Sequence, residues 1–235
     1  MTDNRFMQAK PIEKKSESKT AHTQKKQNAP YTFSPSQTVR GSGEVQDYRK
    51  ITSEAVHTFY VTKPVFFVGF MGAGKTSVSR RLARRCHIAS VDLDSYIQRS
   101  EGIAVSEIFA TQGEEAFRVL ECKTLEHLSQ GEALLVSCGG GIVVKEKSRE
   151  LLKEHGFVVY LQVSADEAAS RISDTSTRPL FSNLDAARKT IADRLPLYEE
   201  VADAVIDTSG KSIDRITSEV KHILLKEGIL WQTQK

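Results

Sequence analysis

The chain of 235 residues has little of several residue types, and each shortage excludes a class of protein. It has only three cysteines, Cys86, Cys122 and Cys138, which lie far apart and form no C-x-x-C pair. This spacing argues against a disulfide framework, a zinc finger and a dithiol redox site, and it is typical of a reduced, cytoplasmic protein. The sequence also lacks the roughly 18 consecutive apolar residues of a membrane-spanning helix. We therefore expect a cytoplasmic protein that does not enter a membrane.

The net charge is only +3, and its distribution argues against a nucleic-acid partner. Residues 1–60 carry ten Lys and Arg against six Asp and Glu, whereas the rest of the chain carries 23 against 24. The basic excess therefore belongs to the first quarter of the chain. The remainder lacks the charge imbalance that a polyanion-binding surface shows.

Residues 1–60 are rich in Lys, Gln, Ser and Thr and show neither helical nor strand periodicity. Such a segment cannot bury enough apolar surface to offset the loss of chain entropy, so we predict a disordered, polar and basic extension. A transit peptide is the alternative, but Asp3, Glu13 and Glu17 argue against it because such peptides are poor in acids. We expect one folded domain over residues 61–235.

From residue 65 onward, apolar runs alternate with helical patterns. This alternation predicts an α/β fold, in which helices cover both faces of a parallel sheet of about five strands and ligands bind at the carboxyl ends of those strands. The expected strands are residues 65–68, 89–91, 133–137, 158–161 and 204–206. The expected helices are residues 75–86, 114–129, 145–154, 165–172, 186–200 and 213–225.

Residues 69–76 read Gly-Phe-Met-Gly-Ala-Gly-Lys-Thr and satisfy the G-x-x-x-x-G-K-[ST] pattern of a phosphate-binding P-loop between a strand and a helix. Backbone N–H groups of such a loop hold phosphate oxygens at the start of the helix. Lys75 would reach the β- and γ-phosphates, and the Thr76 hydroxyl would bind Mg²⁺. We thus expect ATP contacts from Gly72, Ala73, Gly74, Lys75, Thr76 and Ser77.

The sequence after the P-loop argues against two classes of nucleotide-binding protein. A GTP-dependent switch reads guanine with an Asn-Lys-x-Asp element, but the only Asn after residue 60 is Asn183, in a different context. A motor ATPase usually has a strand that ends in an acidic residue, whereas residues 133–137 lead into Cys138 and a run of three glycines. A kinase of small molecules fits better.

Two carboxylates follow the second expected strand, at the edge of the sheet where the P-loop lies. Asp92 could hold Mg²⁺ through a water molecule, and Asp94 could accept a hydrogen bond from an acceptor hydroxyl. The alternative is that Asp92 caps a helix and that Asp94 is a surface acid.

Six elements together resemble the shikimate kinase family in order and spacing, over about residues 63–225. They are the P-loop, the pair Asp92 and Asp94, the segment 113–118 (Gly-Glu-Glu-Ala-Phe-Arg), the glycine run 139–141, the segment 177–180 (Thr-Arg-Pro-Leu) and the segment 194–198 (Arg-Leu-Pro-Leu-Tyr). The resemblance implies a nucleoside-monophosphate-kinase-like three-layer fold with a lid loop. It also implies an enzyme of aromatic amino-acid biosynthesis that uses MgATP to phosphorylate the 3-hydroxyl of shikimate, giving shikimate 3-phosphate and ADP.

The same resemblance implies roles for individual residues. Lys75, Asp94 and Arg178 would be catalytic, with Arg178 in a lid at residues 174–182, while Arg171 and Lys211 would flank the adenine. The shikimate contacts would be Asp94, Arg118, Gly139, Gly140, Gly141 and Arg194. Forked guanidinium groups suit the carboxylate of shikimate, and a carboxylate such as Asp94 suits its hydroxyls.

Two other functions stay open at this point. A kinase of gluconate or another polyol would not need Arg118 and Arg194 to converge on one carboxylate. A nucleotide-binding protein that has lost catalysis would serve regulation, but Lys75, Asp94 and Arg178 are all present, which weighs against it. We expect a monomer that binds small molecules.

Overall fold

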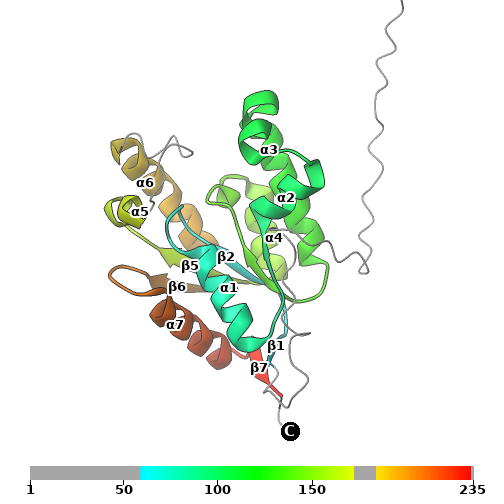
Figure 1. Cartoon of the computed structure of the whole chain (residues 1–235), viewed down its shortest axis with the longest axis vertical. Helices are drawn as coiled ribbons and strands as arrows, with labels where there is room; N and C mark the ends of the chain where they lie inside the picture. The colour runs from blue at the N-terminus through cyan, green and yellow to red at the C-terminus, as the bar shows by residue number, and fades with distance from the viewer. Residues whose placement is uncertain (1–58, 172–183, 234–235) are drawn as a thin grey trace, which may run out of the picture. The chain divides into compact units, whose positions relative to one another are not determined.

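The computed structural model describes residues 59–171 and 184–233, and a five-stranded parallel sheet lies at its centre (Figure 1). The strand order is β3-β4-β2-β5-β6, so β2 is the middle strand. The bounds are β2 (Val65–Val68), β3 (Ser90–Asp92), β4 (Leu135–Ser137), β5 (Phe157–Gln162) and β6 (Ala204–Asp207). The predicted parallel sheet of about five strands is confirmed.

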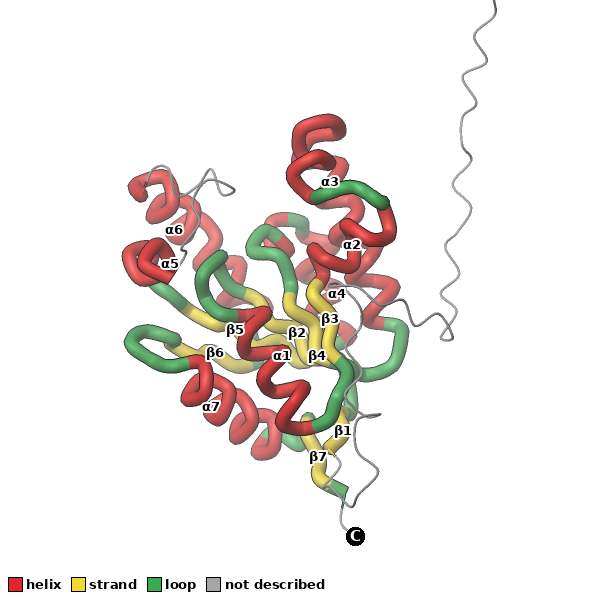
Figure 2. The backbone as a smooth tube through the Cα atoms, viewed as in Figure 1, coloured by secondary structure: helices red, strands yellow, loops and turns green. Residues whose placement is uncertain are grey.

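Helices cover both faces of this sheet and make the three layers seen in Figure 2. On one face lie α1 (Lys75–Cys86) and α7 (Ile213–Lys226). On the other face lie α2 (Leu93–Glu101), α3 (Val105–Ser129) and α4 (Glu146–His155). Two further helices, α5 (Ala165–Arg171) and α6 (Leu184–Val201), follow β5.

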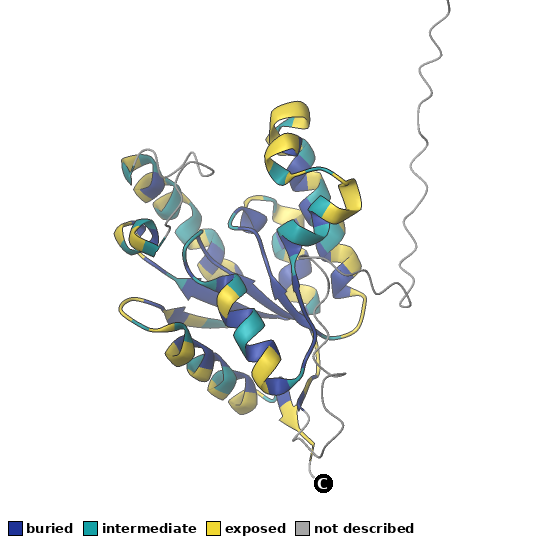
Figure 3. Cartoon of the chain, viewed as in Figure 1, coloured by how far each residue is buried: buried dark blue, intermediate teal, exposed yellow. Residues whose placement is uncertain are grey.

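The middle strand explains why the apolar run at residues 65–68 does not alternate with polar residues. Val65 and Phe67 pack into the core beside α1 and α7, whereas Phe66 and Val68 pack into the core beside α2, α3 and α4. Successive side chains point to opposite faces of a strand, so a strand that is covered twice must be apolar throughout. Figure 3 shows the central strands buried and the exposed residues on the outward faces of the helices.

Two helical segments are absent from the sequence-based prediction. Helix α2 begins directly after β3, where Asp92 is its N-cap and accepts a hydrogen bond from the backbone N–H of Ser95. Helix α3 is longer than the predicted helix because a second helical segment precedes it. The two segments meet at Gly113, whose φ of 84° marks a kink.

A second, two-stranded sheet joins the two ends of the described chain. The antiparallel strands β1 (Phe59–Val61) and β7 (Leu230–Gln232) pair Tyr60 with Trp231. One face of this ladder buries Phe59, Val61 and Leu230 against the core beside α1 and α7. The expected domain start at residue 61 falls inside β1, and the predicted extension lies almost wholly outside the described residues.

The parallel strands bring several loops to one edge of the sheet, because each strand ends there. The P-loop follows β2, Asp92 ends β3, Asp94 lies in the first turn of α2 directly after it, and the glycine run 139–141 follows β4. Residues 208–211, which we call the base loop, follow β6. The predicted lid, residues 174–182, and its Arg178 lie outside the described residues. Within the described ranges, each helix is too short or too polar to span a membrane.

Candidate active site

Two glycines shape the P-loop between β2 and α1. Gly72 has a φ of 80° and Gly74 a φ of 92°, a left-handed conformation that residues with a side chain rarely adopt. Gly74 is also the N-cap of α1, and Ser77 lies exposed in the first turn of that helix. The loop therefore ends at the positive pole of a helix, where unpaired backbone N–H groups attract phosphate.

Lys75 folds back over this loop. Its ammonium Nζ donates hydrogen bonds to the backbone carbonyl oxygens of Gly69, at 2.8 Å, and Phe70, at 2.9 Å. The side chain is buried, with 8% of its surface exposed. The loop carbonyls thus hold a largely desolvated positive charge beside the expected phosphate site, where its attraction for an anion is stronger than it would be in water.

Three side-chain oxygens meet between the P-loop and the ends of β3 and β4. The Thr76 hydroxyl donates to Oδ2 of Asp92 at 2.8 Å and lies 2.9 Å from the Ser137 hydroxyl. Hydroxyl and carboxylate oxygens are ligands that Mg²⁺ prefers, and Mg²⁺ typically relies on few protein ligands plus phosphates and water. The described residues contain no group of three His, Cys, Asp or Glu side chains that could hold a metal by themselves. This oxygen cluster therefore suits Mg²⁺ bound together with a nucleotide.

Asp92 caps α2, and its second carboxylate oxygen is turned toward the P-loop. The Oδ1 atom of Asp92 accepts hydrogen bonds from the backbone N–H and the hydroxyl of Ser95, and these bonds cap α2. Its Oδ2 atom accepts a hydrogen bond from the Thr76 hydroxyl. One carboxylate oxygen thus fixes the start of a helix and the other faces the P-loop threonine.

The glycine run 139–141 lies against the side chains of the predicted acceptor site. A Cβ atom built on Gly139 would lie 2.9 Å from Oδ1 of Asp94 and 2.6 Å from Oε1 of Glu121. A Cβ atom on Gly141 would overlap the guanidinium of Arg118. Positions 139 and 141 therefore favour glycine, because two carboxylates and a guanidinium lie where their side chains would begin.

Arg118 enters the site from α3 with its charge compensated on two sides. Its Nη1 bonds the carboxylate of Glu121, and its Nη2 donates to Oε1 of Glu114 at 2.8 Å. The guanidinium also lies 5.5 Å from the ring centre of Phe117 and 6.0 Å from that of Phe109, close enough for cation–π attraction. These contacts fix the orientation of the guanidinium. Only 9% of the Arg118 side chain is exposed.

Arg194 reaches the same glycine run from α6. Its Nη1 donates to the backbone oxygen of Gly140 at 3.2 Å, and the Tyr198 hydroxyl donates to the same oxygen at 2.5 Å. The two arginines predicted to bind a carboxylate therefore both lie against residues 139–141, one from α3 and the other from α6.

Glu121 is a deeply buried carboxylate of this region, with 1% of its surface exposed. Burial is the main reason why the pKa of its carboxyl is raised to about 7; the nearby Asp94 acts in the same direction, whereas Arg118 and Arg194 act against the shift. The group therefore changes its charge near neutral pH, beside the predicted shikimate contacts.

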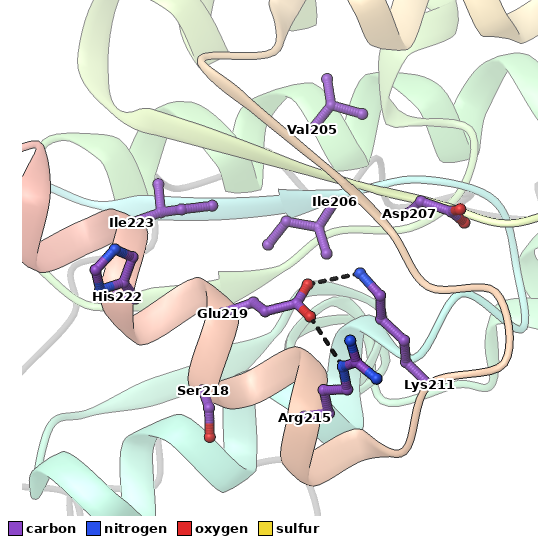
Figure 4. A pocket seen from close by; sticks show the side chains of 9 residues that line it. All are labelled: Val205, Ile206, Asp207, Lys211, Arg215, Ser218, Glu219, His222 and Ile223. Atoms are coloured by element: carbon purple, nitrogen blue, oxygen red, sulfur yellow. Dashed lines mark hydrogen bonds and ion pairs between the residues drawn. The ribbon is translucent and has the colours of Figure 1, made fainter.

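The two residues predicted to flank adenine have different surroundings. Arg171, at the end of α5, donates to the backbone oxygen of Thr208 in the base loop and lies 3.4 Å from the backbone oxygen of Gly72. Lys211 points toward α7, where its Nζ donates to Oε2 of Glu219 at 2.7 Å. Lys211 and Glu219 line a pocket between β6 and α7 (Figure 4). The volume of this pocket is about 510 Å³.

Sequence reasoning missed Ser137, Glu121 and Tyr198. Ser137 ends a strand directly before the glycine run, and its partner across the sheet is Asp92. Glu121 follows Arg118 by three residues, the spacing at which helical side chains meet. Tyr198 belongs to a motif that the sequence analysis used without assigning it a role.

Comparisons with known proteins agree with this geometry. Residues 71–225 match the family model described as shikimate kinase. A shikimate kinase of Bordetella avium is 42% identical over 167 residues, which cover 69% of this chain and 78% of that protein. A shikimate kinase of Dehalococcoides mccartyi is 35% identical over 164 residues, which cover 69% of this chain and 93% of that protein.

Solved structures give the same result. The shikimate kinase from Acinetobacter baumannii in complex with shikimate is similar with a TM-score of 0.67 and 33% identity, over 70% of this chain and 94% of that chain. The shikimate kinase from Aquifex aeolicus is similar with a TM-score of 0.63 and 29% identity, over 71% of this chain and 98% of that chain.

Proposed function

Because this chain belongs to the shikimate kinase family, we propose that it transfers the γ-phosphoryl group of ATP to the 3-hydroxyl of shikimate, giving shikimate 3-phosphate and ADP. The observation that carries this proposal is the convergence of Asp94, Arg118 and Arg194 on the glycine run 139–141. A neutral polyol has no carboxylate for two converging arginines, so the same observation disfavours a kinase of neutral polyols. Gluconate carries a carboxylate of its own, and an assay with different acceptors separates it from shikimate.

In this proposal, Arg118 and Arg194 bind the carboxylate of shikimate, and Asp94 accepts a hydrogen bond from a hydroxyl group of shikimate. The backbone of residues 139–141 can approach the ring closely because no Cβ atom intervenes. Glu121 keeps the Arg118 guanidinium oriented before substrate arrives, which lowers the entropic cost of binding.

The transfer step relies on positioning and electrostatics. The 3-hydroxyl oxygen forms a bond to the γ-phosphorus while the bond from that phosphorus to the β–γ bridging oxygen of ATP breaks. Asp94 orients the hydroxyl and accepts its proton late in the step. Lys75 exchanges its loop carbonyls for phosphate oxygens, and Arg178 adds positive charge from the lid. Mg²⁺, held by Thr76 and through water by Asp92, with Ser137 beside them, would neutralise charge on the phosphates.

A coupled assay of ADP release from MgATP, with and without shikimate, tests the proposal. Strictly shikimate-dependent release is the expected result, and ADP release that ignores shikimate would refute the acceptor assignment. A panel of polyols, gluconate included, would then follow.

The expected state of the enzyme is a cytoplasmic monomer.

The variant Asp94→Asn tests the proposed role of that carboxylate. The amide cannot take the hydroxyl proton, so we expect turnover to fall by about 10²- to 10⁴-fold while ADP binding survives. Near-normal turnover would remove Asp94 from the mechanism.

A further inference from the structure

Helix α5 carries a carboxylate that binds the base loop. Oε1 of Glu167 accepts a hydrogen bond from the backbone N–H of Gly210 at 2.8 Å and another from Nη2 of Arg171 at 2.6 Å. One oxygen atom of Glu167 therefore joins α5 to a loop that lies 43 residues further along the chain.

Arg171 strengthens the same connection. Its Nη2 also donates to the Thr208 carbonyl at 2.6 Å, and its Nη1 donates to the Thr208 hydroxyl at 3.0 Å. Thr208 is fully buried, and its hydroxyl bonds the backbone oxygen of Gln162 at the end of β5 at 2.8 Å. The Arg171 guanidinium is thus held between the Glu167 carboxylate on α5 and Thr208, which is itself bonded to the end of β5.

The P-loop lies against the same helix. A Cβ atom on Gly72 would come within 2.9 Å of the backbone oxygen of Ala168, so the loop and α5 are in direct backbone contact. Arg171 lies about one helical turn beyond Ala168 on α5, and its Nη1 donates to the backbone oxygen of Gly72 at 3.4 Å. Helix α5 therefore connects the loop that receives phosphates with the base loop, and Glu167 supplies the bond to the base loop.

We propose that Glu167 is a positioning residue for the purine of the nucleotide: by holding Arg171 and Gly210 together, it orients the Arg171 guanidinium for stacking on the base. The proposal rests on the proposed function, because the resemblance to shikimate kinases that supports this function also implies that Arg171 flanks the adenine. Hydrogen bonds use the edge of a guanidinium plane and stacking uses its face, so Glu167 and a purine can engage Arg171 at once. The backbone hydrogen bond from Gly210, followed by the Arg171 charge, lowers the pKa of Glu167, which keeps its acceptor oxygens ionised at neutral pH.

The test compares nucleotide with a ligand that has no base. The full-length chain is titrated with ADP and with inorganic pyrophosphate, both with Mg²⁺, as wild type, Glu167→Ala and Glu167→Gln. We expect Glu167→Ala to weaken ADP binding about five- to tenfold, the size of a typical net hydrogen bond, and to leave pyrophosphate binding within about twofold of wild type. Glu167→Gln, which keeps an acceptor oxygen, should lose less.

The matched control is Asp166→Asn. Asp166 is the neighbouring acid on α5, but its Oδ1 pairs with Arg188 of α6 at 2.7 Å on the exposed side, away from the base loop. This variant should bind both ligands like wild type. In turnover assays with shikimate, Glu167→Ala should raise KM for ATP and leave kcat and KM for shikimate near wild type.

Two results would overturn the proposal: unchanged ADP binding in Glu167→Ala, or equal losses for ADP and pyrophosphate, which would indicate a general structural role. The binding experiment does not require catalysis. A wild-type chain that binds ADP but does not phosphorylate shikimate would refute the proposed function while the comparison at Glu167 stayed decisive.

Discussion

Replacing Gly139 with alanine would test the packing of the acceptor site with a single methyl group. Gly139 does not have a positive φ, so alanine can adopt its backbone conformation without strain. The added Cβ would lie 2.6 Å from Oε1 of Glu121 and 2.9 Å from Oδ1 of Asp94, both well inside van der Waals contact. Both carboxylates must therefore move.

The expected loss of activity is much larger than the loss of stability. Overpacking a buried site costs about 1–3 kcal/mol, and we expect about 1 kcal/mol here because both obstructing groups are ends of side chains that can rotate. A displacement of about 1 Å in a reacting or positioning group costs about 100-fold in rate. Gly139→Ala should thus lower kcat/KM for shikimate about 100-fold, while ADP binding at the P-loop stays near wild type.

Gly140→Ala is the matched control for stability. A Cβ atom there would have its nearest neighbours, the Gly69 oxygen and the Met71 nitrogen, at 3.5 Å, which is ordinary contact. Its free energy of unfolding should stay within about 0.5 kcal/mol of wild type. Denaturant unfolding, ADP titration and the coupled assay supply the three readouts. Wild-type kcat/KM for shikimate in Gly139→Ala, or a parallel loss of ADP binding, would refute the reasoning.

The parts of the fold that the sequence predicts are those with local causes. The P-loop is predictable because an apolar strand stops at Gly69 and a helix begins at Lys75, with glycines between them supplying the backbone conformation. The five central strands are predictable because burial on both faces leaves short apolar runs. Helix α2 was missed because it follows β3 without an intervening loop, and it is marked only by its cap, Asp92.

The contacts of the site depend on pairings that no local pattern encodes. Ser137 lies beside Thr76 because the register of β3 and β4 places it opposite Asp92, and register is set by packing of the whole sheet. Lys211 bonds Glu219 because α7 packs back along β6, which turns this side chain toward the helix. Residue types at strand ends predict the chemistry of a site, but the fold decides which of them meet.

Two further variants test the charges and oxygens of the site. Ser137→Ala removes one oxygen from the cluster around Thr76. We therefore expect the Mg²⁺ concentration that gives half-maximal activity to rise several-fold, while KM for shikimate stays unchanged. An unchanged Mg²⁺ titration would remove Ser137 from the metal site. Glu121→Gln tests the pH dependence of substrate binding, because burial raises the pKa of Glu121 to about 7. The folded chain keeps this proton up to about pH 7, whereas the unfolded chain releases it near the ordinary value of 4.5, so the contribution to stability is complete below pH 4.5 and is lost as pH rises to 7. Above pH 7 the anionic Glu121 competes with the shikimate carboxylate for Arg118, so KM for shikimate should rise through this range in wild type and stay flat in Glu121→Gln. Steady-state profiles from about pH 6 to 8 measure this difference, and the same rise in both proteins would assign the titration to another group.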